Sequence, residues 1–197
     1  MLITYITNQM KKLFILGLLI LSNMSCKAQS IVPIETKINY IRAGNGIPET
    51  ITYLKDVNHV LDKYVGVWKG SYGTKNYEFR VTKNVSVYDG LSEDRLIIRY
   101  LITDAGGIIL EDTRSTPDDG KFLIRGHYFN KSYYVLSYGG RNTLCGTAGE
   151  VYIWTLNNNT QLRLSLTLDN ILLNSVDCPN GRVAQVLPLE AMLLTKQ

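Results

Sequence analysis

Three pairs of neighbouring carboxylates are the residues of this sequence best suited to acid–base chemistry: Glu93-Asp94, Glu111-Asp112 and Asp118-Asp119. A glycoside hydrolase needs two carboxyl groups facing each other across a cleft. The last pair, however, sits in a Pro-Asp-Asp-Gly turn, where Asp commonly bonds the backbone. The two histidines, His59 and His127, lack the ligand spacing of a zinc site. The sequence therefore predicts no catalytic residue, no cofactor and no metal.

Two arginines within strand-like runs are the candidate ligand-binding residues. Arg99 shares a strand face with Ile97 and Leu101, and Arg125 shares one with Leu123. If such a face lines the inside of a barrel, the guanidinium could bind a ligand carboxylate. The alternative is an outer face, where arginine stems lie along the sheet and their charged ends reach water.

The N-terminus has the pattern of an export signal. Lys11 and Lys12 precede an apolar run from Leu13 to Leu21 that is too short to span a bilayer, which takes about 20 residues. We expect a signal peptide over residues 1–25, with Met10 as an alternative start. Ser25-Cys26 resembles the end of a bacterial lipobox, which implies a lipid on Cys26. Cleavage nearer Ala28, without a lipid, is the alternative.

Export and charge restrict the partners. Without Lys11 and Lys12, the chain has 19 basic and 17 acidic residues, and it has no basic run that could track phosphates. We expect no nucleic-acid partner. The predicted location is the outer membrane, through the lipid on Cys26 and facing the periplasm; a soluble periplasmic or secreted protein is the alternative. We expect a monomer.

The three cysteines predict one disulfide. If Cys26 carries a lipid, Cys145 and Cys178 remain as an even pair in an exported chain. Three unrelated free thiols are the alternative. A Cys145–Cys178 bond would act as a structural staple, because no Cys-x-x-Cys motif suggests redox chemistry.

The chain divides into a tether and one domain. Residues 26–50 have no clear apolar period and contain Pro33, Gly44 and Gly46, which predicts an irregular, lipid-anchored arm. Residues 51–197 form the domain. Within it, residues 53–64 carry apolar side chains at helical spacing, which predicts a short amphipathic lead-in helix.

From Gly66 onwards the apolar residues follow a period of two, which is typical of β-strands. The leucines at 162, 164, 166 and 168 alternate with polar residues and are the clearest example. The sequence predicts an all-β domain, an antiparallel meander of roughly eight or nine strands closed into a barrel, with a β-sandwich as the alternative. The expected strands are 66–72, 77–82, 95–103, 108–113, 121–129, 133–138, 150–156, 161–168 and 183–195.

The stretch Gly66-Val67-Trp68 resembles the start of lipocalin-like (calycin) barrels. The resemblance implies that Gly66 permits a close backbone approach and that Trp68 plugs the closed end of the barrel. It further implies a basic residue over the Trp ring, for which Arg182 is the nearest candidate.

The segments Trp-Lys-Gly, Asp-Cys-Pro-Asn-Gly and Met-Leu-Leu-Thr-Lys-Gln, with others along the mature chain, resemble a family of small bacterial lipoproteins of unknown function. This second resemblance implies export and a shared fold, and no activity.

Two functions follow as hypotheses. The first is a non-enzymatic barrel that binds a small apolar or amphipathic ligand. The second is an envelope interaction module without a pocket, which should expose a patch of tyrosines such as Tyr133, Tyr134 and Tyr138. They differ in whether the barrel is hollow.

Overall fold

The computed structural model describes residues 30–197. The predicted signal peptide over residues 1–25, the alternative start at Met10 and the lipid site at Cys26 lie outside the described residues.

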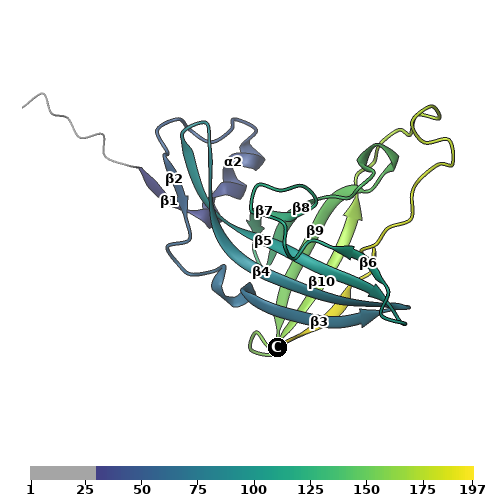
Figure 1. The fold of residues 1–197 in the computed structure, drawn as a ribbon. Coiled ribbons are helices and arrows are strands. Elements are labelled where there is room, and N and C mark those ends of the chain that lie inside the picture. The colour runs from purple at the N-terminus through teal and green to yellow at the C-terminus, as the bar shows by residue number, and fades with distance from the viewer. Residues whose placement is uncertain (1–29) are drawn as a thin grey trace, which may run out of the picture.

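Eight antiparallel strands form a closed up-and-down barrel (Figure 1). Each strand pairs with the next along the chain, and pairing of the first strand with the last closes the ring. The strands of the ring are β3 (Gly66–Tyr72), β4 (Lys75–Tyr88), β5 (Leu91–Asp104), β7 (Ile124–Asn130), β8 (Tyr133–Gly139), β9 (Ala148–Leu156), β10 (Gln161–Leu168) and β11 (Met192–Lys196). The predicted barrel is confirmed, and the sandwich alternative is wrong.

Three short strands extend the sheet outside the ring. The strand β6 (Ile109–Asp112) pairs with the end of β5. At the other end of the long β5, β2 (Tyr53–Lys55) pairs with it in parallel, and β1 (Ile31–Pro33) pairs with β2. These additions lie at opposite ends of the barrel, because β5 runs 14 residues between them.

Side chains alternate between the two faces of each strand, and those that point inward fill the barrel. On β4, Tyr77, Phe79 and Val81 are buried, whereas Arg80 and Thr82 point outward and are exposed. The inward side chains of all eight strands join one buried cluster. Apolar burial on this scale, at about 25 cal/mol per Å², is the main force that closes the sheet. The interior is therefore a packed core along most of its length.

The predicted lead-in helix over residues 53–64 is wrong. This segment begins as β2 and ends in a single 3₁₀ turn, η2 (Asp62–Tyr64). The buried carboxylate of Asp56 accepts hydrogen bonds from the backbone N–H groups of Val60 (2.7 Å) and Leu61 (3.3 Å), and His59 has a positive φ of 55°. A side chain that takes over backbone donors competes with a helix.

Most of the apolar residues with helical spacing pack into the protein interior without forming a helix. Leu54, Leu61 and Tyr64 are fully buried, and Val57 is exposed. One short helix does precede the barrel, but it lies elsewhere: α2 (Lys37–Ala43) follows the 3₁₀ turn η1 (Ile34–Thr36) inside the segment predicted to be irregular. Gly44 ends α2 with a left-handed φ of 71°. The helix contacts β7 on the outside of the barrel.

The predicted disulfide joins Cys145 and Cys178. It ties the 3₁₀ turn η3 (Thr143–Cys145) to the long connection between β10 and β11. The predicted strand 183–195 is only partly right, because β11 begins at Met192. The preceding residues 183–188 cross the end of the barrel as an irregular segment, here named the strap.

Candidate ligand site at the mouth of the barrel

One end of the barrel is closed by Trp68, which is fully buried. Its indole N–H donates a 2.7 Å hydrogen bond to the backbone carbonyl of Tyr64, and the ring of Tyr64 lies 6.2 Å from that of Phe129. The ammonium of Lys196 lies 5.1 Å from the centroid of the Trp68 ring. The expectation of Arg182 at this place is wrong. Arg182 bonds the carbonyl of Gly146 instead, because the strand that returns beside β3 is β11.

Arg99 and Arg125 do not face the barrel interior. Their neighbours Ile98, Tyr100 and Ile124 belong to the interior cluster, so the two arginines lie on the opposite face. Arg99 donates to the carbonyl of Thr116 and pairs with Asp118, and Arg125 donates to the carbonyls of Asp118 (2.8 Å) and Gly120 (2.7 Å). The outer-face alternative holds. These arginines fasten the loop between β6 and β7 to the outside of the barrel.

The acid pairs are also separated by strand geometry. Neighbouring strand residues point to opposite faces, so Glu111 turns inward while Asp112 turns outward. Glu93 pairs with Lys37 at 2.5 Å, and Asp94 accepts hydrogen bonds from Tyr53 and the backbone of Asp56. None of these pairs places two carboxyl groups across a cleft.

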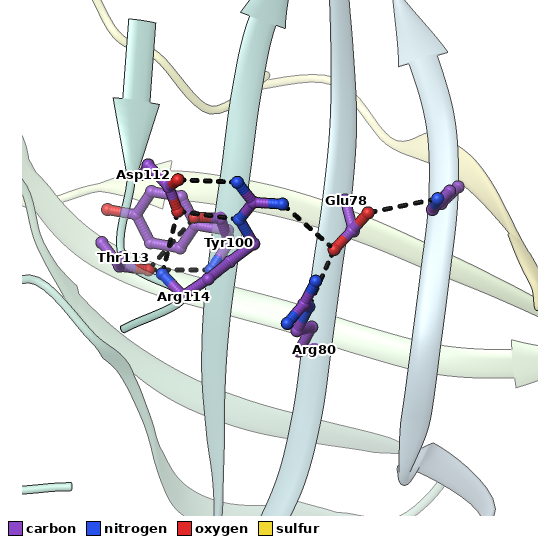
Figure 2. A network of polar contacts seen from close by, with 7 residues as sticks. Glu78, Arg80, Tyr100, Asp112, Thr113 and Arg114 are labelled. Atoms are coloured by element: carbon purple, nitrogen blue, oxygen red, sulfur yellow. Dashed lines mark hydrogen bonds and ion pairs between the residues drawn. The ribbon is translucent and has the colours of Figure 1, made fainter. Parts of the chain in front are cut away.

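Figure 2 shows a network of polar contacts on the outer face that crosses β3 to β6. Glu78 lies 2.8 Å from Arg80, 3.1 Å from Lys69 and 3.9 Å from Arg114, and Arg114 also pairs with Asp112 at 2.8 Å. Partial burial alone would raise the pKa of Glu78, but the hydrogen bonds from Arg80 and Lys69 outweigh it and lower that pKa. Carboxylates held ionised among cations are typical of a structural surface network.

The histidines lie apart. His59 pairs with Asp62 at the surface, and His127 packs against Tyr128 with ring centroids 4.8 Å apart. Burial lowers the pKa of His127. Within residues 30–197, no three His, Cys, Asp or Glu side chains gather as a metal site would require.

The strap covers the other end of the barrel, which is its mouth. Leu187 inserts into the interior cluster, and the carbonyl of Pro188 accepts a hydrogen bond from the Leu166 N–H. Tyr77 donates to the carbonyl of Val186 (3.0 Å) and Lys75 to that of Gln185 (3.1 Å). In Figure 1 this segment belongs to the yellow connection beyond β10, on the side away from β1 and β2.

The disulfide fixes the strap at its start. The N–H of Val183 donates to the carbonyl of Cys145, and the Gln185 amide donates to the carbonyl of Gly146 at 3.0 Å. The strap is thus anchored to η3 on one side of the mouth and to the β3–β4 hairpin on the other.

Polar side chains lie beneath the strap at the end of an otherwise apolar core. Glu111 is 6% exposed, accepts a 2.9 Å hydrogen bond from the Tyr100 hydroxyl and pairs with Arg141 at 3.2 Å. Burial raises the pKa of both Tyr100 and Tyr138, and the nearby charge of Glu111 adds to both shifts. Titratable groups with shifted pKa values beside a pocket mark a candidate binding site.

Two pockets flank the strap. One of about 180 Å³ is bounded by Glu111, Tyr138, Arg141 and the strap residues 183–186. The other, of about 240 Å³, lies between the strap residues 185–188 and the β3–β4 hairpin. Gln185 and Val186 line both. The side-chain amide oxygen of Gln185 (Oε1) is buried and has no hydrogen-bond partner among the described residues, whereas its backbone carbonyl bonds Lys75.

Sequence reasoning did not select these mouth residues. The sequence indicates Glu111 only as half of an acid pair and gives no signal for Arg141, and it predicts a strand over 183–195 where the strap lies. The chain turns at Pro179-Asn180-Gly181, where the Gly181 N–H bonds the carbonyl of Cys178, but the pairing across the mouth depends on barrel closure. The predicted tyrosine patch is also wrong, since Tyr134 and Tyr138 are buried in the barrel.

The fold and the mouth define the class of protein: a small antiparallel β-barrel with eight strands, a packed interior, a plugged floor and a disulfide-bound strap over the mouth. The chain belongs to DUF6705, a family of unknown function, whose model matches residues 10–162. No curated protein and no solved structure matches it. None of the helices in the described part of the chain is long and apolar enough to cross a membrane.

Proposed function

We propose that this protein is a non-enzymatic, lipid-anchored envelope barrel that binds a small amphipathic molecule at its mouth. The polar end of the ligand lies against Gln185, Glu111 and Arg141, and its apolar end lies against Val186 of the strap. The packed core limits binding to this shallow site, so the ligand does not occupy the depth of the barrel.

The observation that carries the proposal is the buried side-chain amide oxygen of Gln185 (Oε1). A buried acceptor left without a donor costs about 1–3 kcal/mol, and the residue that carries this one lines both mouth pockets. A hydroxyl or amine on a ligand would satisfy it. Glu111 and Arg141 lie beside the same space and offer an acceptor and a donor for a second polar group.

The size of the pockets restricts the ligand. Each is smaller than the roughly 300–1,000 Å³ of a typical small-molecule site. They are separated by the strap, whose Val186 borders both. A ligand larger than a few heavy atoms must displace part of the strap, and displacement would join the two spaces.

The export pattern and the disulfide support an oxidising location outside the cytoplasm. Ser30 accepts hydrogen bonds from Thr52 and Tyr53, beside the start of β5, whereas the mouth lies at the end of β5. Cys26 precedes Ser30 by four residues, a reach of at most about 14 Å. A lipid on Cys26 would therefore hold the floor of the barrel towards the membrane and direct the mouth away from it.

Native mass spectrometry of the protein, purified gently from its own membrane fraction, tests the binding. We expect an added mass that disappears on denaturation. Val186→Trp fills both pockets and should abolish it. Val176→Trp adds the same side chain at an exposed position of the β10–β11 connection and should leave it unchanged.

An apo mass for the wild type, or an added mass that survives Val186→Trp, would contradict ligand binding at the mouth. The anchor is tested separately by Cys26→Ser, which should move the protein from the membrane to the soluble fraction. This second result does not depend on the mouth.

A further inference from the structure

A second groove lies on the outside of the barrel, away from the mouth. It has a volume of about 430 Å³ and is lined by Ser132, Tyr133, Tyr152, Trp154, Ser165 and Thr167. This volume falls within the roughly 300–1,000 Å³ that small-ligand sites occupy. Nothing in the proposed function uses this groove.

Strand register brings these side chains together. On β9, Val151 and Ile153 face the core, so Tyr152 and Trp154 face outward. Tyr152 pairs across the sheet with Ser165 of β10. The groove therefore runs over three neighbouring strands, with aromatic rings on β8 and β9 and hydroxyl groups on β10.

The aromatic rings are held in place. The centroids of Tyr133 and Tyr152 lie 5.6 Å apart, and the ring planes are inclined by 62°. The Tyr152 hydroxyl donates a 2.6 Å hydrogen bond to Glu150, and the Tyr133 hydroxyl accepts one from Asn130. Rings fixed on a sheet lose little conformational entropy when a ligand binds.

Trp154 carries an unused polar group. Its ring is only partly buried, and its indole N–H has no hydrogen-bond partner among the described residues, unlike that of Trp68. Its cross-strand neighbour is Arg163, which is exposed. An aromatic face with free donors at its border suits a ligand that is apolar on its faces and polar around its edge.

The polarity of the lining decides between ligand classes. A stable protein interface buries about 800 Å² and about 20–30 residues on each partner, whereas six residues line this groove. A lipid tail would need an aliphatic lining. Here the outward-facing aliphatic residue next to the groove, Val135, is already fully buried. What remains accessible is aromatic rings and hydroxyl groups, which match the C–H faces and the hydroxyl edges of a sugar ring.

We propose that this groove binds saccharide rings. The ring faces stack on Trp154, Tyr152 and Tyr133, and the sugar hydroxyls bond to Ser165, Thr167, the Trp154 N–H and Arg163.

Intrinsic fluorescence gives a direct test, because the chain has two tryptophans and Trp68 is fully buried. Maltohexaose, cellohexaose, the hexamer of N-acetylglucosamine and oligogalacturonate would be titrated into the full mature domain. We expect a saturable shift in emission with at least one of them, together with protection of Trp154 from iodide quenching. No saturable change with any of the four would overturn the proposal.

Two variants of Tyr152 distinguish the loss of ring stacking from a loss of folding. Tyr152→Phe keeps the ring and should bind within about threefold of wild type, whereas Tyr152→Ala should weaken binding by about tenfold. Tyr88→Ala, at the exposed tip of the β4–β5 hairpin, is the matched control and should bind as wild type. Equal binding by Tyr152→Ala and wild type, with all variants folded by circular dichroism, would also overturn the proposal.

Discussion

Lys196, the next-to-last residue of the chain, lies over Trp68, the third residue of the first barrel strand. Its ammonium is 5.1 Å from the ring centroid, and the two residues are direct partners in the β11–β3 register. The strand pair that closes the barrel therefore also covers its floor. A cation over a tryptophan face is attracted by the ring quadrupole.

Removal of this cation should weaken the barrel. We expect Lys196→Met, which keeps the stem length, to lower the free energy of unfolding by about 0.5–2 kcal/mol. Lys69→Met is the control. It removes a half-exposed cation of the outer Glu78 network and should cost less than about 1 kcal/mol. Urea unfolding followed by tryptophan emission measures both; equal losses would contradict a special role for Lys196.

Gly66 should tolerate no side chain. Its φ is +138°, and an added Cβ would lie 2.9 Å from the Cε of Lys196. We expect Gly66→Ala to cost about 1–3 kcal/mol from backbone strain, and to displace Lys196 from the indole. Gly73→Ala, at φ +59° with open space around it, isolates the cost of a left-handed turn. Melting temperatures that fall no further for Gly66→Ala than for Gly73→Ala would count against this explanation.

The disulfide should stabilise the whole domain and the strap in particular. Cys145 and Cys178 are 33 residues apart, and closing a loop of that length contributes about 4 kcal/mol in the chain-entropy model. We expect the Cys145→Ser/Cys178→Ser double variant to lose about this much. Hydrogen exchange should show the earliest loss of protection at the Leu166 N–H, which bonds the strap at Pro188. Loss of protection spread evenly over the barrel would show that the bond does not act through the strap.

Stability should fall in alkali. Burial raises the pKa of Tyr77 to about 12, and a hydrogen bond to Asp94 raises the pKa of Tyr53 to about 12. The phenol pKa in an unfolded chain is about 10. Between these values the folded state binds more protons than the unfolded state, so the stabilisation is complete below pH about 10 and is lost as the pH rises through about 12.

Tyrosinate absorbance and circular dichroism, titrated together, measure this loss. We expect the buried tyrosines to ionise in one step with unfolding. Tyr77→Phe should make the decline with pH less steep. Ionisation of all tyrosines at their ordinary pKa with the fold intact would contradict the burial of these phenols.

The barrel could be predicted because its evidence is local. Alternation such as that of Leu162, Leu164 and Leu166 selects a strand and its buried face, and Pro-Asp-Asp-Gly selects a turn. The prediction of a lead-in helix was wrong for a different local reason. Leu54, Leu61 and Tyr64 have helical spacing, but the Asp56 carboxylate bonds the backbone donors that a helix would have used.

The candidate site could not be predicted in the same way. Arg99 and Arg125 share a face with apolar residues whether that face points inward or outward, and period two does not distinguish the two sides of a sheet. Only the closed ring shows that Ile98 and Ile124 take the interior. The arginines are then left to hold the loop around Asp118.

The sequence by itself determined the all-β class, the turns, the cysteine pair and the tryptophan at the start of the first barrel strand. These depend on periodicity, local backbone preference and counting. The tertiary structure alone decided that Lys196 covers Trp68, that the strap lies over Glu111, and that Tyr133, Tyr152 and Trp154 share an outer groove. Each of these arrangements brings together separate segments of the chain, and the register between the strands that hold them is set by closure of the ring as a whole.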